Sequence, residues 1–207
     1  MKSLLLWCAF FAALDLHCQM IPAAHHYSEN SIFMVCRGTR HKIGVIPAEF
    51  NLRDRHSTHV AIAVVEKGVL SIYHVTNDRG EKSALTRESL SSFVAETDVL
   101  YWSIWEYRSN PVVISKLKKL LRTALSKKIV FDMDFESGND KLYCSEFCAE
   151  ILQKLNPDQL TFQRSKKALN FIYRTALDKK ILDYYPVDFF QNDSRFQKIR
   201  ETFVTAF

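Results

Sequence analysis

The chain has 207 residues, of which 47% are hydrophobic and 25% charged, with five glycines and five prolines. This length suits one domain with a substantial core and is too short for two large ones, and the composition excludes a disordered or low-complexity protein. The net charge of +5 is modest. The one basic cluster, at residues 116–128, is typical of the solvent-exposed face of an amphipathic helix. No nucleic-acid motif accompanies it, so we expect no nucleic-acid partner.

The N-terminus has the profile of a secretory signal. Lys2 supplies a short positive region, and residues 4–14 form an apolar stretch too short to span a bilayer. We therefore expect a signal peptide over residues 1–19, one mature domain over residues 20–207, and a secreted or periplasmic location. Cys18 leaves the cleavage site and a lipid modification open. No later stretch predicts a stable membrane span.

The first predicted elements are strands. Residues 31–37 read as one strand, and residues 58–66 and 69–76 are rich in β-branched and apolar side chains. Lys67-Gly68, which separates the last two, predicts a two-residue hairpin turn.

Helices and strands then alternate along the chain. We expect a helix over residues 86–96, an aromatic-rich strand over residues 99–107, and a helix over residues 111–127 with Asn110 before it and Pro111 in its first turn.

The second half of the chain reads as helical. Helices are expected over residues 144–155 and 166–177, and the aromatic tail, residues 184–207, is expected to pack back on the domain. Together these elements predict an α+β fold, with a small antiparallel β-sheet packed against helices.

Cys144 lies where a loop rich in turn residues, 136–140, becomes a helix. A thiol in the first helical turn feels the positive end of the helix dipole, which lowers its pKa and favours the nucleophilic thiolate. The backbone N–H groups of the same turn can hold an oxyanion. With Cys36 and Cys148, Cys144 is one of three cysteines left after signal removal, an odd number that predicts a free thiol. This layout is typical of a cysteine hydrolase.

Two of the seven histidines, His59 and His74, interrupt strands that are otherwise apolar. Each alone is also typical of a core histidine with a hydrogen-bonded partner. A two-residue turn at Lys67-Gly68 pairs Thr76 with His59 and puts His74 diagonally beside His59 on the same face, about 7–8 Å away at Cα. A three-residue turn would put them on opposite faces. We expect His59 to take the proton of Cys144, and His74 to orient His59.

These residues resemble a known family. Residues 58–62 read THVAI and open the hairpin, and residues 143–147 read YCSEF and start the late helix. Both resemble the permuted papain-like hydrolases of the YiiX/YaeF kind, a branch of the NlpC-type superfamily. Residues 30–33 (NSIF) and 131–135 (FDMDF) resemble further segments of those domains. The similarity covers residues 29–155.

The resemblance implies a circularly permuted papain-like (NlpC-type) fold, with Cys144 as the nucleophile and His59 as the base. The third residue of the YiiX-like branch is usually a Glu, whereas this sequence has His74, as in NlpC-type and lecithin–retinol acyltransferase enzymes. Catalysis therefore remains expected, but the substrate is less well defined. The family's substrates are cell-wall peptides, other amides and lipids, so the expected partner is a peptide, peptidoglycan or lipid-like substrate.

Four neighbours of the expected nucleophile complete the predicted site. Tyr143 and Ser145 are assigned to the oxyanion or substrate pocket, Asp132 to the anchoring of the preceding loop, and Glu146 to the support of the helix start. No cofactor or metal is expected, because the spacing of Cys144 and Cys148 is not that of common zinc motifs.

The function expected from the sequence is a secreted cysteine hydrolase that cleaves an amide bond through an acyl-enzyme. Two alternatives remain open: a lipid acyltransferase or thioesterase with the same triad, and a catalytically silent binding module on the same fold. The oligomeric state is left open.

Overall fold

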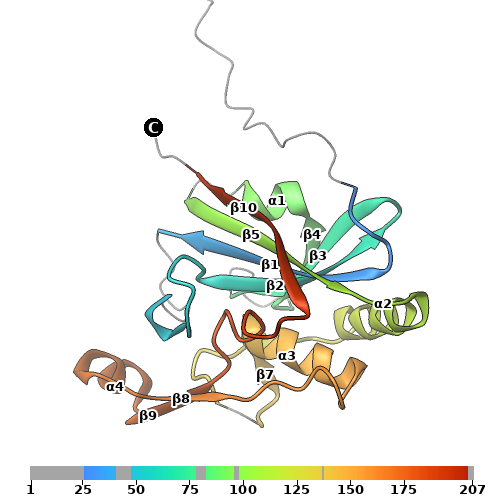
Figure 1. Cartoon of the computed structure of the whole chain (residues 1–207). Helices are drawn as coiled ribbons and strands as arrows, with labels where there is room; N and C mark the ends of the chain where they lie inside the picture. Colours follow the sequence, from blue (N-terminus) through green and yellow to red (C-terminus); the bar gives the residue numbers. More distant parts are fainter. Residues whose placement is uncertain (1–25, 41–47, 78–82, 96–97, 137, 205–207) are drawn as a thin grey trace, which may run out of the picture.

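The structure is a computed structural model, and it describes residues 26–40, 48–77, 83–95, 98–136 and 138–204. The predicted signal peptide and Cys18 lie outside the described residues. An antiparallel sheet of six strands, in the order β10-β5-β1-β2-β3-β4, forms the centre of the molecule (Figure 1). Its strands are β1 (Ser31–Thr39), β2 (His59–Glu66), β3 (Val69–Val75), β4 (Leu85–Ser89), β5 (Val99–Arg108) and β10 (Phe196–Phe203).

The remaining elements are short apart from two helices. The helices are α1 (Leu90–Val94), α2 (Pro111–Leu125), α3 (Cys144–Leu155), α4 (Phe171–Leu177) and the 3-10 turn η1 (Ala48–Phe50). Two further strand pairs are β6 (Val130–Phe131) with β7 (Lys141–Leu142), which is parallel, and β8 (Ser165–Ala168) with β9 (Ile181–Tyr184), which is antiparallel.

Strand alternation divides the core into two clusters, one on each face of the sheet. Val60 and Ile62 of β2 pack in the same cluster as the buried residues of α2 and α3, and we call this side the α3 face. Ala61 and Ala63 belong to a separate cluster with Phe93 of α1, on the side that we call the α1 face. Figure 1 shows α1 above the sheet and α3 below it.

The predicted α+β class is confirmed, but two predicted helices are wrong in part. Residues 86–89 of the expected 86–96 helix belong to β4. Helix α1 begins only at Leu90 because the Ser89 hydroxyl accepts a hydrogen bond from Ser92 N at 3.1 Å and so caps the helix there.

The expected helix over residues 166–177 likewise divides into two elements. Its first part is β8, which pairs with β9, and α4 begins at Phe171. The cause is Asn170, whose side chain accepts a hydrogen bond from Tyr173 N at 3.1 Å and caps α4. The tail packs back on the domain as predicted, and β10 extends the sheet beside β5.

The predicted two-residue turn between β2 and β3 is confirmed. Glu66 pairs directly with Val69, and Lys67 and Gly68 have φ angles of 52° and 78°. Both central residues are left-handed, as a type I′ turn requires. Glycine adopts this conformation without a steric penalty, whereas lysine does not.

We predict that Lys67→Asn stabilises the protein by about 0.5–1 kcal/mol, because Asn tolerates left-handed backbone better than Lys. Equilibrium urea unfolding measures the change. Lys128→Asn is the matched control, since Lys128 is exposed and its φ is not positive. A loss of stability in Lys67→Asn, or an equal gain in the control, would contradict this reading of the turn.

Candidate functional site

Cys144 is the first residue of α3, and its side chain is buried, with 4% of the residue exposed. The preceding Tyr143 is the N-cap, with extended backbone (φ −104°, ψ 172°) and no capping hydrogen bond from its side chain. The first-turn N–H groups are therefore not occupied by a cap of the usual Ser, Thr, Asp or Asn kind. Such N–H groups are suited to holding an oxyanion beside the thiol.

The start of α3 is tied to the segment that follows β9. Tyr143 and Ser145 are both fully buried. The Tyr143 hydroxyl accepts a hydrogen bond from Tyr185 N at 2.8 Å, and the Ser145 hydroxyl donates to Tyr185 O at 2.7 Å. Both side chains thus position the helix, and what Ser145 can offer an oxyanion is its backbone N–H.

Asp132 holds the loop that leads into α3. Its buried carboxylate accepts hydrogen bonds from Asp134 N at 2.9 Å and Glu136 N at 2.7 Å. Phe135, between them, has a φ of 53° and packs edge-on against Tyr143, with ring centroids 5.0 Å apart. The carboxylate therefore stabilises a strained loop conformation just before the helix.

Glu146 is a buried carboxyl in the first turn of α3, 3% exposed. Its Oε1 lies 2.9 Å from Arg164 Nη1, and Arg164 also binds Asp183 of β9. Burial raises the pKa of Glu146 to about 7, an effect that the neighbouring Arg164 reduces but does not cancel. Glu146 is thus a structural carboxyl that links α3 to β9.

The two histidines of the hairpin are hydrogen-bonded to each other, as the predicted register requires. His59 Nε2 lies 2.9 Å from His74 Nδ1, and both residues are buried. His74 Nε2 lies 2.8 Å from Glu88 Oε1. Burial opposes ionisation of Glu88, but it is outweighed by the hydrogen bond from His74, the positive charge of His74 when protonated, Arg37 and a hydrogen bond from Ser92, so the pKa of Glu88 lies below its usual value. We call His59, His74 and Glu88 the histidine chain.

The sequence analysis missed Glu88 because it assigned residues 86–96 to a helix. In the structure His74 pairs with Thr86, so Glu88, two residues further along β4, points to the same face as His74. Residues 85–89 read LTRES, with one apolar residue followed by four polar ones, so no alternation marked them as a strand.

Cys144 and the histidine chain lie against opposite faces of the sheet. The rings of His59 and His74 contact Phe93 on the α1 face, at centroid distances of 5.9 and 5.1 Å. Cys144 packs in the cluster on the α3 face. The sulfur of Cys148, one turn further along α3, lies 4.0 Å from Val60 O. Helix α3 therefore crosses β2 near the first residues of β2. The proton transfer from Cys144 to His59 therefore stays a prediction.

The other two thiols are poor nucleophile candidates. Burial raises the pKa of Cys36, and burial also raises the pKa of Cys148 well above its ordinary value. Cys36, Cys144 and Cys148 form no disulfide with one another.

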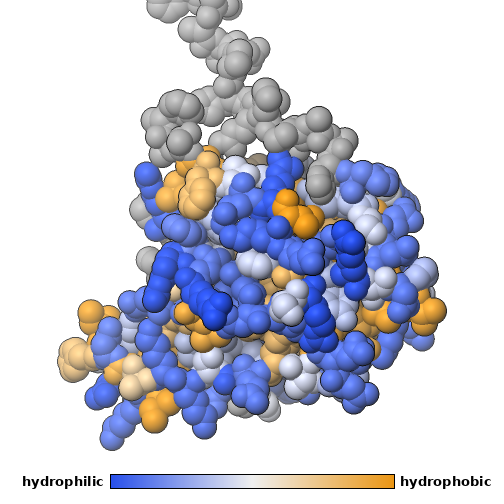
Figure 2. All heavy atoms as spheres, in the orientation of Figure 1, coloured by the Kyte–Doolittle hydropathy of each residue, from blue (hydrophilic) through white to orange (hydrophobic). Residues whose placement is uncertain are grey.

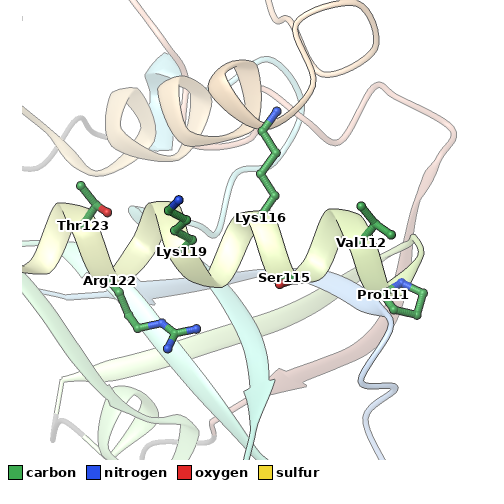
Figure 3. A pocket seen from close by; sticks show the side chains of 7 residues that line it. All are labelled: Pro111, Val112, Ser115, Lys116, Lys119, Arg122 and Thr123. Atoms are coloured by element: carbon green, nitrogen blue, oxygen red, sulfur yellow. The ribbon is translucent and has the colours of Figure 1, made fainter.

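A surface hollow runs along α2, away from the predicted site residues. It is lined by Pro111, Val112, Ser115, Lys116, Lys119, Arg122 and Thr123 (Figure 3). Among the residues that the structure describes, no three His, Cys, Asp or Glu side chains converge as metal ligands. No helix within the described ranges is long and apolar enough to cross a membrane.

The comparisons with known proteins show the fold alone. No protein-family model and no curated protein matches the chain. The chain is similar to the crystal structure of the metalloprotein YiiX from Escherichia coli O157:H7, DUF1105, with a TM-score of 0.63 and 10% sequence identity. The similarity covers 86% of this chain and 100% of that one. The fold is therefore YiiX-like, as the sequence resemblance predicted.

The raised pKa of Glu146 predicts a pH-dependent stability. Folding favours the protonated carboxyl, so its contribution is complete below the ordinary value of 4.5 and is lost as the pH rises through about 7. Glu146→Gln keeps an acceptor for Arg164 and removes the titration. We expect the variant to gain about 1–3 kcal/mol relative to wild type between pH 4.5 and pH 8.

Urea unfolding across this pH range measures the difference. The control is Glu150→Gln, on the same helix, where the carboxyl is 37% exposed and forms a surface ion pair with Lys154. The difference in unfolding free energy between Glu150→Gln and wild type should change little with pH. Parallel pH profiles for wild type and Glu146→Gln would contradict the prediction.

Proposed function

We propose that the protein is a cysteine hydrolase that cleaves an amide bond through an acyl-enzyme. Cys144 is the nucleophile and His59 the base in this proposal. The observation that carries it is the histidine chain, in which hydrogen bonds of 2.9 and 2.8 Å link His59 to His74 and His74 to Glu88. The substrate class is a cell-wall peptide or another N-acyl compound.

The histidine chain fixes which nitrogen of His59 is basic. Ionised Glu88 can only accept a hydrogen bond, so His74 carries its proton on Nε2. Neutral His74 then accepts at Nδ1, and His59 must donate from Nε2. The lone pair of neutral His59 is therefore on Nδ1. Nδ1 is therefore the nitrogen that takes a proton from the thiol in this proposal.

The acyl transfer follows from these assignments. Cys144 loses its proton to His59 Nδ1, and the thiolate adds to the substrate carbonyl. Backbone N–H groups at the start of α3 stabilise the oxyanion. The leaving amine takes the proton from His59, which leaves a thioester on Cys144. His59 then removes a proton from water, the hydroxide attacks the thioester, and the acid and the free thiol are released.

The proposal requires the thiol and the imidazole to meet around the edge of β2. His59 is the first residue of that strand, so its side chain is next to the strand's end, and α3 crosses β2 at the neighbouring Val60. Catalytic contacts are often long before substrate binds. The proposal therefore includes a shift of the α3 start or of the His59 rotamer that brings the two groups together.

The fold and the N-terminal sequence support the same proposal. The YiiX-like fold agrees with the resemblance from which Cys144 and His59 were assigned. The apolar N-terminal segment fits export, where the substrates named above are found. YiiX is described as a metalloprotein, whereas in this chain the donors His59, His74 and Glu88 are hydrogen-bonded to each other.

The test is the rate of iodoacetamide labelling against pH. A thiol of ordinary pKa is less than about 1% thiolate at pH 6, so an activated Cys144 should label much faster than a free cysteine. We expect Cys144→Ala to abolish this labelling and His59→Ala to slow it at least about tenfold. Glu88→Gln should slow it less, because the imidazole remains.

Two matched controls accompany these variants. Cys148→Ala removes a thiol from the same helix, and His56→Ala removes an exposed histidine near β2, so neither should alter the rate at pH 6. Labelling that rises only above about pH 8 and ignores His59 would leave the silent binding module as the better account. That alternative has its own support in the burial of Cys144 on the face opposite the histidines.

Analysis of the reaction products distinguishes cleavage of an amide bond from cleavage of an ester or thioester bond. Purified protein that releases amines from peptide substrates, and not fatty acids from phospholipid or thioester substrates, agrees with the amidase proposal. The opposite preference would favour the lipid acyltransferase or thioesterase alternative. Either activity must be lost in Cys144→Ala.

A further inference from the structure

The segment from β8 to β9, residues 165–184, carries an exposed apolar surface. We call it the α4 finger. Its helix α4 has no buried residue. Phe171, Ile172 and Ile181 are 82%, 72% and 59% exposed. Figure 2 shows orange, apolar spheres at the lower left, where Figure 1 draws α4 and β9. Monomeric proteins seldom expose neighbouring large apolar side chains without a partner.

These side chains come from adjacent positions. Ala168, the last residue of β8, pairs with Ile181, the first residue of β9. Leu169 N also donates a hydrogen bond to Lys180 O at 3.0 Å, which closes the base of the finger. Helix α4 begins directly after this base, with Phe171 and Ile172. The apolar residues are therefore held together on one projecting element.

The same segment is strongly basic. Residues 165–184 contain five basic and two acidic side chains, a local excess of three positive charges: Lys166, Lys167, Arg174, Lys179 and Lys180 against Asp178 and Asp183. Lys179 pairs with Glu136 at 3.4 Å, and Lys166 lies 3.9 Å from Asp183. Lys166, Arg174 and Lys180 are exposed. The surface around the apolar side chains is thus cationic.

We propose that the α4 finger docks the protein on an anionic lipid bilayer. Exposed Phe and Ile side chains bury favourably at the boundary between headgroups and acyl chains, and nearby Lys and Arg side chains attract anionic headgroups. Helix α4 has seven residues, so it can lie at the surface but not cross the bilayer. The excess of positive charge favours a membrane over a second copy of the chain, whose equivalent surface would repel it.

The exposed side chains proposed to dock include neither Cys144 nor a member of the histidine chain. Figure 1 shows α4 and β9 at the lower left of the molecule, apart from α1 and from the first residues of β2. Variants in the finger can therefore be tested without removing a catalytic group.

The experiment is co-sedimentation of the full chain with two kinds of vesicle, phosphatidylcholine alone and phosphatidylcholine mixed with phosphatidylglycerol. We expect binding to the mixed vesicles and little binding to the neutral ones. Lys166→Gln with Lys180→Gln should weaken binding roughly 25-fold, at about fivefold for each charge. Phe171→Ser with Ile172→Ser should weaken it at least about tenfold.

The control is Val112→Ser on α2, where the side chain is 79% exposed and lies outside the finger. It should bind the mixed vesicles like wild type. Because the altered finger residues are exposed, circular dichroism and the thermal midpoint should stay unchanged in every variant. The proposal is overturned by equal binding to both vesicle types, or by unchanged binding in the Phe171/Ile172 variant. It is also overturned if the chain ignores vesicles and instead forms a dimer that this variant abolishes.

Discussion

The side-chain parity of the β2–β3 hairpin is the constraint on which the rest of the site depends. A two-residue turn at Lys67-Gly68 sets Glu66 opposite Val69, and this register places His59 and His74 on one face within hydrogen-bonding distance. One residue more in the turn would move His74 to the other face. The left-handed backbone of Lys67 costs some conformational energy, and the register that this turn sets holds His59 and His74 side by side.

The same parity separates the two halves of the candidate site. The α1 face holds the histidine chain under Phe93, which Arg37 covers in turn, with its guanidinium 4.4 Å from the ring centroid. The α3 face holds Cys144, at a helix start fixed by Tyr143 and Ser145 through Tyr185. Each half is held by its own hydrogen bonds, and α3 crosses β2 at Val60, the residue next to His59.

Much of this arrangement could be predicted from the sequence, because strong local signals produce it. The hairpin, the Asn110-capped helix and the helix start at Cys144 each follow from turn, cap or periodicity rules. Ser89 and Asn170 caused the errors, since both cap helices inside stretches of general helical composition. The role of Glu88 was hidden by the first error. The face of the sheet on which α3 packs is decided by tertiary contacts. No local sequence signal therefore predicted that Cys144 and His59 lie against opposite faces.

The central claim is that Glu88, through His74, holds neutral His59 as the tautomer with its proton on Nε2 and none on Nδ1. The most direct measurement is a long-range ¹H–¹⁵N correlation spectrum of the imidazole nitrogens near neutral pH, assigned with single histidine variants. The account predicts that His59 and His74 both carry their proton on Nε2, with unprotonated Nδ1, and that Glu88→Gln disturbs both ring spectra. A proton on Nδ1 of His59, or spectra that ignore Glu88, would contradict it.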